Sequence, residues 1–113
     1  MRAIPKKLLI HSVGFRKKLE EDRWGQSTVS FEQTLSCVRF EPSSKIVRTT
    51  NNSEVQLSAT LIYDCTNSRP KNFEFKLDNI ISFNNQKHRV VIIEPLYDNK
   101  KLHHYEIGLV KQV

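Results

Sequence analysis

Apolar and polar positions alternate along much of this chain with the two-residue period of a β-strand. The clearest case is residues 54–63, where every odd position from Val55 to Tyr63 is apolar and positions 56, 58 and 60 are polar. A helix cannot place this pattern on one face, because its apolar positions recur every three or four residues. The pattern predicts a strand with one face in the core and the other in water.

Other segments with strand-like patterns are residues 7–15, 27–40, 79–83, 88–97 and those after Lys101. The segment 27–40 is expected to break near Glu32. Asn84 and Asn85 separate two of the runs, and asparagine tolerates the left-handed backbone of tight turns. We therefore expect a single all-β domain over residues 1–113, a six- to seven-stranded antiparallel β-barrel or sandwich.

A polar segment, residues 42–53, lies between the second and third main strands, 27–40 and 54–63. Its length is close to that at which a loop without secondary structure becomes uncommon and is usually functional. This long loop is the first candidate for a functional site.

Composition supports the all-β prediction, because nine Val, nine Ile and six Thr are β-branched, whereas alanine occurs only twice. The 18 Lys and Arg exceed the 12 Asp and Glu, which gives a net charge of +6. The positive residues come in small groups rather than in a block of five or six. Two interpretations stay open: a scattered, solubilising surface, which we favour, and a positive face that approaches nucleic acid.

Neither cysteine usage nor hydropathy indicates secretion or membrane insertion. Cys37 and Cys65 could form at most one bridge, so we expect reduced thiols in a cytoplasmic setting. The longest apolar run is the quartet Val90–Ile93, far short of the about 20 residues that span a bilayer. We expect no signal peptide, because only three apolar residues follow the first charges of the chain.

No motif for catalysis is present, so we predict no catalytic, cofactor-binding or metal-binding residues and no enzyme activity. His103 and His104 are adjacent in a strand and are expected to point to opposite faces. A zinc site from His11, His88 and one of this pair is conceivable, but ordinary hydrogen-bonded histidines are favoured.

Aromatic residues near lysines keep a nucleic-acid alternative open. Phe73, Phe75 and Phe83 could stack on bases in an OB-like barrel that binds single strands, although a role in the core is favoured. Trp24, in a turn after an acidic run, is interpreted as either a cover for the core or an anchor for a partner.

Five segments resemble the minor capsid proteins of tailed phages and prophages of Gram-positive bacteria, a family similar in length and strand pattern to head-closure (stopper) proteins. These segments are residues 4–11, 22–25, 38–45, 94–98 and 102–109. The resemblance implies a virion protein, assembled in the host cytoplasm, that forms a ring below the portal and adaptor. Such a subunit would retain packaged double-stranded DNA and dock the tail or tail-terminator proteins, with no membrane partner.

Stopper-type proteins carry a long loop between their second and third main strands that reaches into the channel. By this resemblance, the expected channel loop of this chain consists of Ser43, Ser44, Lys45, Ile46, Val47, Arg48, Thr49 and Thr50. Lys45 and Arg48 are the positive charges most expected to lie near DNA.

Overall fold

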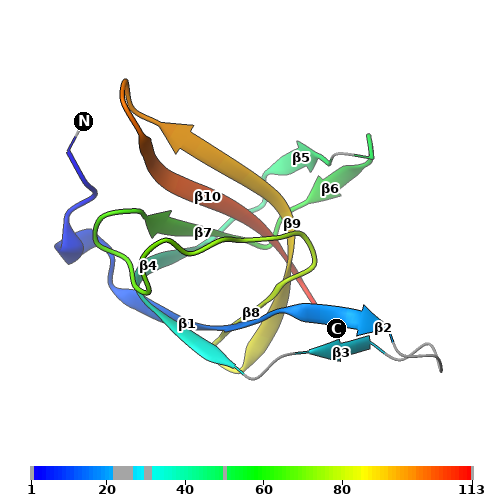
Figure 1. Cartoon of the computed structure of the whole chain (residues 1–113). Helices are drawn as coiled ribbons and strands as arrows, with labels where there is room; N and C mark the ends of the chain where they lie inside the picture. Colours follow the sequence, from blue (N-terminus) through cyan, green and yellow to red (C-terminus); the bar gives the residue numbers. More distant parts are fainter. Residues whose placement is uncertain (1, 22–26, 30–31, 50, 113) are drawn as a thin grey trace.

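Six antiparallel strands close into a barrel in the order β1-β4-β7-β10-β9-β8 (Figure 1). The computed structural model describes residues 2–21, 27–29, 32–49 and 51–112. The barrel strands are β1 (His11–Arg16), β4 (Gln33–Pro42), β7 (Ala59–Asp64), β8 (Ile80–Phe83), β9 (Gln86–Tyr97) and β10 (Leu102–Lys111). The prediction of an all-β barrel is confirmed.

Two short hairpins and one helical turn lie outside the barrel. The hairpins pair β2 (Lys18–Glu21) with β3 (Ser27–Val29) and β5 (Ile46–Arg48) with β6 (Glu54–Gln56). A 3-10 turn, η1 (Lys6–Leu8), precedes β1. No helix in the described part of the chain is long and apolar enough to cross a membrane.

The β8–β9 hairpin follows the sequence prediction closely. Its turn is Asn84–Asn85, and both residues have positive φ angles, 50° and 62°. Positive φ at both central residues is the geometry of the two-residue turn whose twist matches that of the flanking strands. The expected break near Glu32 is also present, between β3 and β4.

The predicted strand over residues 54–63 is divided in two, which corrects the expectation of one continuous strand. Residues 54–56 form β6 and pair with β5, whereas residues 59–64 form β7 and pair with β4 and β10. Both parts keep the predicted apolar face, but they bury it in different clusters. Ala59, Leu61 and Tyr63 lie in the barrel core.

The barrel core draws fully buried side chains from every barrel strand, including Phe15, Leu35, Leu61, Ile81 and Ile107. The loop before β8 adds Phe73 and Phe75, whose rings pack edge-to-face with Phe15 at centroid distances of 4.6 and 6.0 Å. Aromatic pairs of this geometry contribute about 0.5–1.5 kcal/mol beyond their buried area. Phe73 and Phe75 of this loop therefore belong to the core.

Gly108 of β10 is a point where the barrel admits no side chain. A Cβ atom there would overlap Ile92 Cγ2 and come within 3.0 Å of Leu57 Cδ2. We predict that Gly108→Ala lowers the free energy of unfolding by about 1–3 kcal/mol, as expected for overpacking. Urea denaturation followed by circular dichroism measures this change.

Gly14→Ala is the matched control, because a Cβ atom there would meet the Glu32 side chain, which is 43% exposed and can rotate away. Rotation would give up its ion pair with Arg16, 3.9 Å long and partly exposed, which contributes little to stability. Its expected cost is below about 0.5 kcal/mol. Equal destabilisation by the two substitutions would contradict the packing argument.

Candidate interaction site on the projecting arm

Residues 43–58 form an arm that leaves the barrel after β4 and returns to it at β7. Figure 1 shows the β5–β6 hairpin of this arm standing off the barrel beside β9. The arm occupies the position predicted for the long loop between the second and third main strands. Its conformation differs from that prediction, because much of it is an ordered hairpin rather than an irregular loop.

The root of the arm is held by an apolar cluster separate from the barrel core. Val47 and Leu57 from the arm bury against Val91 of β9. Ile46, next to Val47 in β5, is 63% exposed because successive strand residues face opposite sides. The arm is thus anchored by one face and presents the other to solvent.

Hydrogen bonds order the tip of the arm. The Thr49 N–H donates to Ser53 O over 2.8 Å, and the Asn52 N–H donates to Thr49 O over 2.9 Å. Asn52 has a φ of 66°, which an asparagine adopts more readily than most residues. Thr49, Asn52 and Ser53 are therefore joined by the hydrogen bonds of a turn.

The charges of the arm are largely balanced. Arg48 donates to Glu54 Oε1 over 3.1 Å and to Asn52 Oδ1 over 2.9 Å, because the hairpin register places Arg48 opposite Glu54. Both ionic side chains are more than half exposed, so the pair contributes little to stability. Lys45 is exposed and forms no ion pair with a described residue.

A hollow of about 330 Å³ separates the arm from the barrel. Thr49, Val55 and Leu77 line it, together with Arg89, whose guanidinium donates to Asp78 Oδ1 over 3.1 Å. Leu77 is 46% exposed, so apolar and charged surface meet beneath the arm.

The structure places most of the predicted channel-loop residues on this arm. Ser43, Ser44 and Lys45 precede β5, Ile46–Arg48 form it, and Thr49 begins the tip. Thr50 and Trp24 lie outside the described residues. Val47 differs in kind from its neighbours, because it faces the root cluster and is buried.

Three of the four histidines make side-chain hydrogen bonds, whereas the buried Nδ1 of His88 has no hydrogen-bond partner among the described residues. His11 Nδ1 accepts from the Phe40 N–H over 3.0 Å, and burial lowers the pKa of His88. The expectation that His103 and His104 point to opposite faces is wrong: their Nδ1 atoms lie 2.7 Å apart. A register irregularity between Leu102 and His104 in the β9–β10 pairing breaks the alternation there. Within the described ranges, no three His, Cys, Asp or Glu side chains gather as metal ligands.

Cys37 and Cys65 are free thiols. Burial raises the pKa of the Cys65 thiol, and the neighbouring Asp64 carboxylate raises it further. A raised pKa favours the protonated thiol, which is the unreactive form.

The aromatic residues of the nucleic-acid alternative do not form one exposed platform. Phe75 is 6% exposed and Phe73 packs against the core, so neither offers a free face to a base. Phe83 stacks on Phe40 at a centroid distance of 4.4 Å, in a recess that His11 and His88 also line. The stacking hypothesis is left without two of its three residues.

The structure defines a small closed β-barrel protein with a hairpin that is anchored at its root and projects from the barrel. The family model described as minor capsid protein matches residues 5–109. The chain therefore belongs to the minor capsid protein family and is a structural phage protein, a component of the virion. No curated protein matches the sequence significantly.

The root cluster yields a test of how the arm is held. We predict that Val47→Ser accelerates amide hydrogen exchange in residues 46–56 by about tenfold, because it removes buried apolar contact between arm and barrel. Ile46→Ser, one residue away on the exposed face, should leave exchange in the arm unchanged. Hydrogen exchange read by mass spectrometry compares the two, and equal protection in both variants would contradict the anchoring.

Proposed function

We propose that this chain is a head–tail joining subunit of the head-closure type, which forms a ring below the portal and adaptor and docks the tail. The family supports a structural virion role. The observation that carries the finer proposal is the arm, an ordered hairpin fixed at its root and free on its Ile46 face. The proposed channel loop is this arm, residues 43–50 with their return strand β6.

The arm has the features that assembly through a hairpin requires. Each of its strands has three residues and pairs only with the other among the described residues, so both carry an outer edge of unpaired backbone groups. Such edges accept strands from neighbouring chains. In a ring, arms from adjacent subunits would converge near the axis and could narrow the channel by edge pairing.

The exposed face of the arm suits a protein neighbour better than DNA. Ile46 offers apolar surface, and Arg48 is already paired with Glu54. Within residues 43–49, Lys45 is the one positive residue without an ion pair to a described residue. We therefore propose that the arm contacts other subunits, the portal, the adaptor or the tail proteins.

Replacing Lys45–Gln56 with Asn-Gly tests this function. A backbone hydrogen bond from Ser43 N to Ser58 O, over 3.1 Å, already joins the residues on each side of the replaced segment, so a two-residue turn between Ser44 and Leu57 can close the gap. We predict a folded barrel that, in a phage lacking the native gene, yields DNA-filled heads that leak DNA or fail to join tails. Electron microscopy and plaque counts measure the outcome.

The matched control is the charge swap Arg48→Glu with Glu54→Arg, which keeps the arm and its cross-strand ion pair. This control should support normal phage yield. Normal yield from the shortened arm would refute the proposed role of the arm. Loss of folding, checked by circular dichroism of the purified variant, is separated from loss of function by the melting transition of the barrel.

A further inference from the structure

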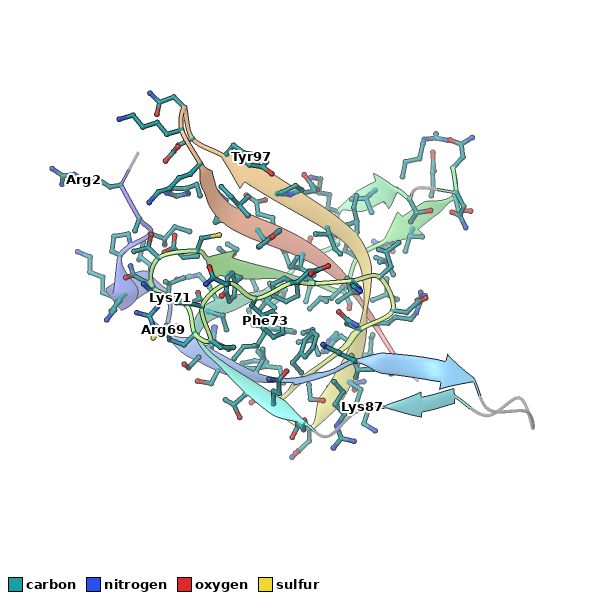
Figure 2. All side chains as sticks on the ribbon, viewed as in Figure 1. Arg2, Arg69, Lys71, Phe73, Lys87 and Tyr97 are labelled. Carbon is teal, nitrogen blue, oxygen red and sulfur yellow. The ribbon has the colours of Figure 1, made fainter. Side chains whose placement is uncertain are left out.

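We propose that the phosphate backbone of double-stranded DNA binds the end of the barrel that carries the N-terminal segment, rather than the arm. We call this surface the basic end, and its positive residues are Arg2, Lys6, Lys7, Arg69 and Lys71. Figure 2 shows Arg2, Arg69 and Lys71 on the same side of the molecule, away from the β5–β6 arm.

Hydrogen bonds between the Ile4 backbone and two side chains bring the two parts of the basic end together from distant positions in the sequence. Ile4 N donates to Asp64 Oδ1 over 3.1 Å, and Asn67 Nδ2 donates to Ile4 O over 2.7 Å. These bonds fix the segment that carries Arg2, Lys6 and Lys7 against the loop that carries Arg69 and Lys71.

Asp64 organises this junction. Its carboxylate also accepts the Thr66 and Asn67 N–H groups, at 3.1 and 2.8 Å, and the residue is fully buried. Both oxygens of the Asp64 carboxylate thus accept hydrogen bonds from backbone N–H groups. Neither oxygen forms an ion pair with the described lysines and arginines of the basic end.

A pair of histidines fixes Arg2 from the other side. His104 Nε2 bonds Glu106 Oε2 over 3.1 Å, the two Nδ1 atoms bond over 2.7 Å, and His103 Nε2 bonds Arg2 O. These contacts hold the Arg2 backbone against β10.

The arginines that the structure describes differ in their partners. Four of them each face a carboxylate, at Arg16–Glu32, Arg39–Glu41, Arg48–Glu54 and Arg89–Asp78. Of these four, Arg39 also donates to Leu8 O at the end of η1, over 3.1 Å. Neither Arg2 nor Arg69 pairs with any acid of the described residues, and the same holds for Lys6, Lys7 and Lys71. The basic end therefore carries five positive residues that have no carboxylate partner among the described residues, whereas the arm carries one, Lys45.

An unpaired cluster of this kind fits a phosphate backbone. Each phosphate neutralised by a lysine or arginine releases condensed counterions, which drives binding without reading the base sequence. Flexible lysines on η1 and on the loop after Arg69 suit a repeating charge rather than one fixed group. The choice of double-stranded DNA as the polyanion rests on the proposed function, which sets the subunit beside packaged DNA.

The test measures binding of the full chain to a short fluorescent DNA duplex by anisotropy over a range of salt concentrations. The variant Lys6→Glu, Lys7→Glu, Lys71→Glu reverses three exposed charges of the basic end. The matched control Lys45→Glu, Lys87→Glu, Lys111→Glu reverses three exposed charges elsewhere and has the same net charge. Lys→Arg at the three basic-end positions should preserve binding.

We expect the basic-end variant to bind DNA at least tenfold more weakly than the native chain at low salt. The magnitude of its slope of log K against log salt should fall by about 2–3. The control should keep most of the native affinity and most of the native slope. Equal losses in the two variants, or no binding by the native chain, would overturn the proposal. Polyglutamate is the competing polyanion in this test. If it binds as tightly as DNA and loses affinity in the same variants, the partner is an acidic protein and the proposal is overturned. This result is independent of the arm replacement, so each proposal can fail alone.

Discussion

Closure of the barrel through β1 is the constraint on which the rest of the structure depends. β1 pairs with β4 on one side and with β8 on the other, and its Phe15 is fully buried against Ile81 and Leu35 of those strands' shared core. Closure pairs most strand edges of a barrel. Among the described residues, the two external hairpins keep outer edges, and residues 92–97 of β9 pair with β10 but not with the shorter β8. These edges are the places where another chain could add a strand.

Much of this fold could be predicted from the sequence because local signals agree with the final structure. Asn84 and Asn85 supply the backbone conformation of a tight turn, and the runs on each side are strands. The division of residues 54–63 could not be predicted, since alternation shows that one face is buried but not which cluster buries it. Val55 and Leu57 pack with Val47 and Val91, and only the tertiary arrangement separates them from Leu61.

The arm lies where the sequence predicts the long loop, but its conformation and its charge pairing differ from that prediction. A polar segment with lysine and arginine resembles a basic loop, yet the register of the hairpin pairs Arg48 with Glu54. The reverse holds for the basic end, whose residues lie more than 60 positions apart in the chain and are joined by the hydrogen bonds between Ile4 and the Asp64 turn. The placement of His103 and His104 could not be predicted from strand alternation either. A register irregularity between Leu102 and His104 brings their Nδ1 atoms within 2.7 Å of each other.

The two ends of the molecule consequently differ in the kind of partner that they can bind. The arm combines unpaired strand edges, an exposed isoleucine and balanced charge, a combination suited to other protein chains. The basic end combines unpaired cations with a buried acid that has no free acceptor, which favours a polyanion. Since both features are anchored to the same closed barrel, the two proposed contacts, with protein and with DNA, would use separate surfaces of one subunit.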